Sequence, residues 1–198
     1  MTKFDAVKVE VLKDETLSKN WYHLRNVTVA YTGTDGRTRK LKRETYDRGN
    51  GATILLYDPE RDSIVLVRQF RVPPFMNGHS GILLETPAGL LDGDEPAEAI
   101  RREVMEETGY QVDAVRHLFQ AFMSPGAVTE IVHFYAATVK SGDRIATGGG
   151  VATEDEDIEV VELPLDQALA MIPTGEICDG KTIMLLQWAA LNRASLRG

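Results

Sequence analysis

Apolar and polar side chains alternate through residues 1–47, which is the pattern of strands with one covered face. The apolar members of the alternating runs are Val7, Val9, Val11, Leu24, Val27 and Val29. Turn-forming residues at 18–20 and 32–36 divide the stretch. We therefore predict a small antiparallel β-sheet. Because three strands bury little apolar surface by themselves, we expect this sheet to pack on something else.

Residues 48–198 combine strand-like and helix-like patterns. Strands are expected near residues 51–57, 62–70, 112–122, 130–139 and 157–162. Helices are expected over residues 96–108, 165–172 and 179–195. The predicted organisation is an α/β domain over residues 48–198, preceded by an antiparallel β domain over residues 1–47.

Composition narrows the class of protein. The chain has 198 residues, 43% hydrophobic and 26% charged, which suits a folded globular enzyme. A net charge of −8 argues against a nucleic-acid partner, which needs a basic face. No apolar run approaches the roughly 18 residues that a membrane span needs. The N-terminus has no apolar signal core and Cys178 is the only cysteine, so we expect a cytoplasmic protein without a membrane partner.

The predicted helix at 96–108 carries an unusual group of acids. Glu103, Glu106 and Glu107 lie three and four residues apart, so their carboxylates crowd one side of the helix. Like charges at this spacing repel, and a divalent cation would turn the repulsion into binding. Carboxylate oxygens are the ligands that Mg²⁺ and Mn²⁺ take. A solvated acidic helix face is the other interpretation.

The residues around this helix resemble the Nudix box, whose second half reads R-E-U-x-E-E-x-G-U, with U a bulky apolar residue. Residues 102–110 match this half. The first half differs, because the loop at 87–96 is one residue short. Counting forward from Gly89 puts Glu95 in register, whereas counting back from Arg102 gives Asp94. Resemblance to the Nudix family implies an α/β/α sandwich with a mixed sheet.

Further segments resemble the branch of this family that hydrolyses nucleoside diphosphate sugars. They cover residues 42–51, 68–71, 123–126, 154–159 and 174–182. The resemblance implies GDP-mannose as the substrate, split into GMP and mannose 1-phosphate. ADP-ribose, which gives AMP and ribose 5-phosphate, is the alternative. A nucleotide-sensing domain without catalysis is a third interpretation, and the retained carboxylates argue against it.

The same resemblance implies a Mg²⁺ cofactor, which Mn²⁺ could replace. Glu103 and Glu107 are the expected side-chain ligands, together with the main-chain carbonyl of Ala88. Glu107 also counts among the expected catalytic residues. Glu106 is either a further catalytic or metal-binding residue or the partner of Arg102 in a salt bridge.

An acidic run at 154–159 forms a second candidate group. By resemblance, Glu156 binds the metal or acts as the base for the attacking water, and Asp155 lies beside it. The other interpretation is a solvated loop, which is what most acidic runs are. The glycines at 148–150 suit a loop that closes over substrate.

Resemblance also gives a set of substrate-binding positions. They are Trp21, Lys42, Arg43, Glu44, Arg71, Ala88, Gly89, Leu90, Glu107, Glu130, Asp155, Glu156 and Lys181. Trp21 is a candidate to stack on the base, or else a partly buried sheet residue. Without the resemblance, residues 42–44 would be an exposed strand edge, and Arg71, Glu130 and Lys181 ordinary surface charges. The family likeness further implies a homodimer whose N-terminal sheet exchanges onto the partner.

Overall fold

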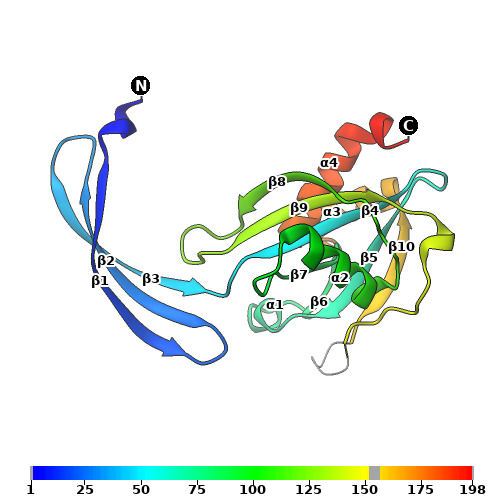
Figure 1. Cartoon of the computed structure of the whole chain (residues 1–198), viewed down its shortest axis with the longest axis horizontal. Helices are drawn as coiled ribbons and strands as arrows, with labels where there is room; N and C mark the ends of the chain where they lie inside the picture. The colour runs from blue at the N-terminus through cyan, green and yellow to red at the C-terminus, as the bar shows by residue number, and fades with distance from the viewer. Residues whose placement is uncertain (1, 152–156, 198) are drawn as a thin grey trace. The chain divides into compact units, whose positions relative to one another are not determined.

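The computed structural model describes residues 2–151 and 157–197 (Figure 1). The chain forms two compact units, and each is described by itself. The first contains residues 1–49 and 122–130, and the second contains residues 50–121 and 131–198.

The first unit is a three-stranded antiparallel sheet in the order β1-β2-β3. Its strands are β1 (Lys8–Lys19), β2 (His23–Thr32) and β3 (Thr38–Asp47), after a short 3₁₀ turn at Lys3–Ala6. Val11 pairs with Val29, and Val29 pairs with Leu41, so one face carries an apolar row across all three strands. Within residues 2–49 only Gly33 is buried, so this sheet has no closed core of its own.

The second unit contains a mixed sheet of seven strands. The strands are β4 (Gly51–Asp58), β5 (Ser63–Phe70), β6 (Ile82–Glu85), β7 (Ala88–Leu90), β8 (Arg116–Phe122), β9 (Ile131–Thr138) and β10 (Glu159–Pro164). The main path runs β10-β5-β4-β9-β8, with β6 added to β5 and β7 added to β4. The β4–β9 pair is parallel, whereas β4 pairs antiparallel with β5 and with β7.

Helices cover both faces of this sheet (Figure 1). They are α1 (Val72–Met76), α2 (Pro96–Thr108), α3 (Leu165–Thr174) and α4 (Gly180–Leu196), with a 3₁₀ turn at Ser141–Asp143. The predicted α/β/α sandwich with a mixed sheet and a separate antiparallel β region is confirmed. None of the helices in the described part of the chain combines the length and hydropathy that a membrane span needs.

Strand β4 lies at the centre and is buried along its whole length. Its residues Ile54 and Leu56 join a core cluster with Ile100 and Val104 of α2. Thr53 points the other way and takes part in hydrogen bonds that reach α4. Coverage on both faces explains why β4 is almost continuously apolar rather than alternating.

Helix α2 begins and ends where its sequence signals predict. Pro96 occupies the first helical position, where its missing N–H leaves no partner unsatisfied. Gly109 ends the helix in the left-handed conformation, with φ of 73°, and its N–H bonds to the Met105 carbonyl at 3.0 Å. The predicted helix at 96–108 is confirmed.

The stretch between β5 and α2 differs from the sequence prediction. We expected an uninterrupted loop at 87–96, but Ala88–Leu90 form β7 on the first half of β4. The preceding strand β6 pairs with β5. The chain therefore crosses from β5 to β4 at Thr86–Pro87, and the sheet divides there. This crossing lies next to the acids of α2.

Candidate active site

Two carboxylates of α2 reach neighbouring residues of β7. The Ala88 N–H donates a hydrogen bond to Glu107 Oε2 at 3.1 Å, and Glu107 is only 2% exposed. Glu103 lies one turn earlier on the helix and contacts Gly89. Because Ala88 and Gly89 are adjacent, the structure brings together the predicted ligands Glu103, Glu107 and Ala88.

Gly89 permits this close approach. A Cβ atom built on Gly89 would overlap the carboxyl group of Glu103. Any larger residue would therefore have to displace that carboxylate. The strand itself does not demand glycine, because Gly89 has no positive φ. The absence of a side chain at Gly89 leaves room for the Glu103 carboxylate.

Arg102 contacts one of the two acids that the shortened loop offers. Its side chain pairs with Asp94, and Nη2 lies 3.7 Å from Glu103 Oε1. Glu95 instead occupies the N-cap of α2. The residue that partners the arginine is therefore Asp94, as counting back from Arg102 indicates. Among the described residues no ion pair within 4 Å joins Arg102 to Glu106, although the Glu106 carboxylate contributes to raising the pKa of Arg102.

The oxygen ligands near β7 suit a Mg²⁺ ion that is bound by few protein groups. Within residues 2–151 and 157–197 no group of three or more acidic, histidine or cysteine side chains is arranged to hold a metal. Mg²⁺ usually keeps several waters and takes one or two carboxylates plus substrate phosphates. Glu103 and Glu107, with the glycine gap beside them, supply two carboxylates of that kind.

Two of the predicted cationic residues meet on one buried acid that the sequence analysis missed. Glu85 ends β6 and is 1% exposed. Arg71 donates from Nε to Glu85 Oε1 at 2.9 Å and from Nη2 to Oε2 at 3.1 Å. Lys181, in the first turn of α4, donates to Glu85 Oε2 and lies 3.0 Å from Asp179 Oδ2. The signal available in the sequence was an acid that directly follows the apolar run at 82–84.

Electrostatics keep this acid ionised. Burial by itself would raise the pKa of Glu85, but Lys181 and Arg71 outweigh burial and lower the pKa to about 2. Burial would lower the pKa of Arg71, and the Glu85 carboxylate outweighs it, so the Arg71 pKa is raised. The carboxylates of Glu107 in α2 and of Asp179 at the start of α4 add to the rise of the Arg71 pKa.

The glycine stretch before the acidic run is held against the end of α2. The Gly149 N–H donates to the Glu107 carbonyl at 2.9 Å, and the Gly150 N–H donates to the Glu106 carbonyl at 3.0 Å. Gly148, Gly149 and Gly150 all have positive φ. Residues 148–150 are therefore fixed next to the acidic helix α2. The predicted catalytic residue Glu156 and the predicted substrate-binding residue Asp155 lie outside the described residues.

The remaining predicted positions belong to the first unit. Trp21 is 85% exposed in the β1–β2 turn, so it is not a partly buried sheet residue. Residues 42–44 are exposed on the edge strand β3. Glu130 is only 14% exposed in its side chain and lies 3.5 Å from Arg48 Nε.

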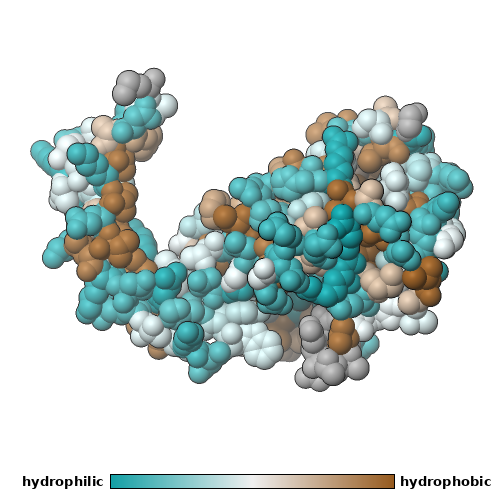
Figure 2. Space-filling model, in the orientation of Figure 1, coloured by the Kyte–Doolittle hydropathy of each residue, from teal (hydrophilic) through white to brown (hydrophobic). Residues whose placement is uncertain are grey.

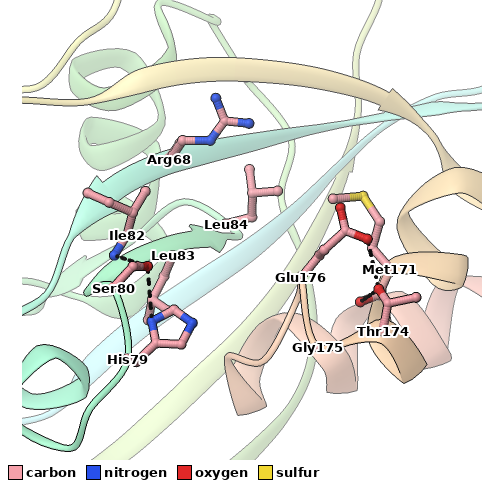
Figure 3. Close-up of a pocket in the computed structure, with 10 residues that line it drawn as sticks. All are labelled: Arg68, His79, Ser80, Ile82, Leu83, Leu84, Met171, Thr174, Gly175 and Glu176. Atoms are coloured by element: carbon pink, nitrogen blue, oxygen red, sulfur yellow. Dashed lines mark hydrogen bonds between the residues drawn. The ribbon is translucent and has the colours of Figure 1, made fainter.

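A separate pocket of about 380 Å³ lies beside β6 (Figure 3). Arg68, His79 and Ile82 line one side, and Met171 of α3 and Glu176 of the α3–α4 connection line the other. None of its lining residues belongs to the predicted site. The pocket and the acidic helix are therefore separate features of the second unit.

The fold and the carboxylate pair on α2 define the class of protein. A model of the NUDIX domain matches residues 47–186. The chain belongs to the Nudix family. A second model, described as the GDP-mannose pyrophosphatase NudK N-terminal domain, matches residues 8–46.

Similar proteins from enteric bacteria carry one name, GDP-mannose pyrophosphatase. The protein of Citrobacter koseri is 58% identical over 182 residues, covering 91% of this chain and 94% of its own. The Klebsiella pneumoniae protein is 55% identical over 184 residues, covering 92% of each chain. The Yersinia enterocolitica protein is 55% identical over 188 residues, covering 94% of this chain and 97% of its own.

Proposed function

We propose that this protein hydrolyses the pyrophosphate of GDP-mannose to GMP and mannose 1-phosphate, with Mg²⁺ as cofactor. The observation that carries the substrate is the match to GDP-mannose pyrophosphatases over more than nine tenths of the chain. The retained acids Glu103 and Glu107 support catalysis rather than sensing alone. A single cysteine in the chain agrees with a cytoplasmic location.

The site residues divide the chemistry among them. Glu103, Glu107 and the Ala88 carbonyl would hold the metal, which supplies charge neutralisation and a coordinated water of lowered pKa. Arg71 and Lys181 would bind phosphate oxygens. Glu156 would bind the metal or take the proton of the attacking water. Residues 42–44 and Trp21 would contact the nucleotide, with Glu130 completing the substrate set.

Product analysis tests the proposal directly. The purified protein is incubated with Mg²⁺ and GDP-mannose, GDP-glucose or ADP-ribose, each with and without EDTA. We expect GMP and mannose 1-phosphate from GDP-mannose as the fastest reaction, abolished by EDTA. Faster release of AMP and ribose 5-phosphate from ADP-ribose would replace the substrate but keep the class. No turnover of any of them would overturn the enzymatic function.

We further propose a homodimer in which residues 1–47 exchange onto the partner and residues 48–198 form the hydrolase domain. The apolar row Val11, Val29 and Leu41 supports this proposal, because nothing within residues 2–49 buries it. Val9 and Val11 are 60% and 62% exposed. Figure 2 shows hydrophobic atoms along this unit. A second copy would cover such a face.

Light scattering coupled to size exclusion tests the dimer. Wild type should elute with twice the mass of one chain, and Val11→Asp should shift it toward the monomer by placing a charge in the apolar row. Lys13→Asp, which adds an acid at an exposed position of the same strand, is the control and should stay dimeric. A monomeric wild type would rule out the exchange.

Mixing two inactive variants tests whether each site uses both chains. Glu107→Gln disables the hydrolase domain, and Arg43→Ala disables the N-terminal contacts. In an exchanged mixed dimer, one site carries both defects and the other carries neither. Unfolding and refolding the two together should therefore restore activity that neither variant has alone. If activity stays absent, each site is built from one chain.

A further inference from the structure

Glu85 fixes the geometry of two cations that come from distant parts of the chain. Arg71 directly follows β5, and Lys181 lies in the first turn of α4. The Arg71 contact is bidentate, which sets the plane of the guanidinium as well as its position. The Arg71 N–H also donates to the Gly81 carbonyl at 2.7 Å, so backbone and side chain are both held.

Asp179 fixes the second cation from the other side. Its carboxylate caps α4 by accepting from Thr182 N at 2.9 Å and from Thr182 Oγ1 at 2.6 Å. Thr182 Oγ1 in turn accepts from the Thr86 N–H at 2.8 Å. Lys181 is therefore attached to a capped helix end that is itself attached to the residue after Glu85.

Neither cation is used up by these contacts. Arg71 has five N–H donors, and the contacts to Glu85 involve only Nε and Nη2. Its side chain is 39% exposed, and that of Lys181 is 15% exposed. Two cations and the two acids Glu85 and Asp179 make a cluster of zero net charge. The cluster therefore offers fixed donors rather than a broad positive field.

Stability alone does not favour this arrangement. Removing a carboxylate from water carries a desolvation cost, and apolar residues of similar volume often serve a fold equally well. Glu85 is also only three residues from Ala88, which contacts Glu107. The orienting acid, its two cations and the α2 acids thus lie around the same crossing of the chain.

We infer that Glu85 is a positioning residue that holds Arg71 and Lys181 so that their remaining donors meet the phosphate oxygens of the nucleotide sugar; this role rests on the function proposed above. Glu85 does not touch the substrate. It acts through the two cations, so its loss should weaken substrate binding more than it slows turnover of bound substrate.

Steady-state kinetics of Glu85→Gln test this role. The amide keeps the shape and removes the charge, so KM for GDP-mannose should rise about tenfold or more while kcat changes less. Asp62→Asn is the matched control, because Asp62 also holds two arginines, Arg193 and Arg197, and has its pKa lowered to about 2. It should lower thermal stability and leave KM unchanged. The same outcome for Glu85→Gln would make Glu85 merely structural.

A double-mutant cycle separates positioning from a direct effect. In the Arg71→Ala/Lys181→Ala background, adding Glu85→Gln should change KM no further, because the groups it positions are gone. A full additional rise would overturn the inference. Glu85→Asp keeps the negative charge on a side chain that is one methylene shorter. It should therefore raise KM less than Glu85→Gln does. If Glu85→Gln does not fold, an unchanged KM for Glu85→Asp overturns the inference equally.

Binding measurements distinguish this inference from the proposed function. If wild type turns over GDP-mannose and Glu85→Gln has a normal KM, the function stands and the inference fails. If wild type turns over no nucleotide sugar, calorimetry with GDP and Mg²⁺ replaces kinetics. Weaker GDP binding by Glu85→Gln than by Asp62→Asn would then support the inference without the activity. Equal binding, or none by wild type, would overturn it.

Discussion

Two acidic side chains on α2 lie against the backbone of β7. Glu107 receives the Ala88 N–H, and Glu103 lies in the gap that Gly89 leaves. Both carboxylates therefore have a fixed place before any ion binds. Preorganised ligands of this kind lose little freedom when a cation arrives.

We expect Glu107 to contribute to turnover through its negative charge rather than through its shape. Glu107→Gln can still accept from Ala88, so we expect a folded protein whose kcat falls at least about 100-fold. Glu98→Gln on the same helix is the control, because its side chain is 71% exposed and pairs with Arg101. Circular dichroism and GDP-mannose turnover are measured together. Full turnover by Glu107→Gln would move the metal site elsewhere.

Gly89 should be required for metal affinity. In Gly89→Ala the added methyl overlaps the Glu103 carboxylate and must push it aside. We expect the Mg²⁺ concentration for half-maximal activity to rise about tenfold. Gly142→Ala provides the control, because a Cβ there meets nothing within 4 Å. A normal Mg²⁺ requirement in Gly89→Ala would show that Glu103 can bind the ion from another position.

At the scale of elements, backbone hydrogen bonds join the end of α2 to the glycine stretch at 148–150, and this contact is called the joint below. A Cβ on Gly148 would overlap the backbone of Glu107 and Thr108, and its φ of 68° disfavours other residues. The joint cannot act as a freely swinging hinge in the described structure. It fixes the position of residues 148–150 beside the end of α2.

Gly148→Ala should loosen this joint. Overlap and strain together should destabilise the fold by about 1–3 kcal/mol and lower the melting temperature. Gly149→Ala also has a positive φ, of 110°, but its Cβ would meet only the Ile158 carbonyl oxygen, at an ordinary 3.7 Å, so it should be milder. Calorimetry gives the melting temperatures, and hydrogen exchange at Gly150 reports the lost hydrogen bond. Equal effects of the two variants would mean that strain alone matters.

Sequence patterns predict the elements whose signals are local. Helix α2 matches its predicted range because Pro96 and Gly109 mark both ends. Strands β6 and β7 were missed because they have four and three residues and exist only through pairing with β5 and β4. So short an element carries no period that a sequence could show.

The site residues also differ in whether a local sequence signal points to them. The helical spacing of the acids predicted that Glu103 and Glu107 lie side by side, because neighbours on one face of a helix are close in sequence. Glu85 gave no such signal, because its partners are 14 and 96 residues away. Only the crossing between the two halves of the sheet brings Arg71, Glu85 and Lys181 together. The predicted roles of Asp155 and Glu156 remain predictions.

At the scale of the whole molecule, two ionised acids link stability to pH. The pKa of Glu85 falls from 4.5 to about 2 and that of Asp62 from 3.8 to about 2. Arg193 is the main cause for Asp62, whereas Lys181 and Arg71 overcome burial at Glu85. A folded-state pKa below the unfolded value stabilises the fold above the unfolded pKa, and the benefit is lost as pH falls.

The chain should therefore lose stability steeply between pH 4.5 and 2. Urea unfolding at pH 6, 4 and 3 measures the decline. In Glu85→Gln, position 85 cannot take up a proton when the protein unfolds. The free energy of unfolding of this variant should therefore be lower than that of wild type at pH 6, but it should decline less as the pH falls. Parallel declines in wild type and variant would show that Glu85 has a normal pKa in the folded protein.

The hydrogen bond from Ala88 to Glu107 makes one backbone amide an internal reporter. An ion that draws electron density from the Glu107 carboxylate weakens it as an acceptor, so the Ala88 amide proton resonance should move upfield. Nuclear magnetic resonance could then follow occupancy of the site in protein labelled at alanine nitrogen. Such a titration needs no nucleotide and no turnover, and it would compare cations one by one in inactive variants as readily as in wild type.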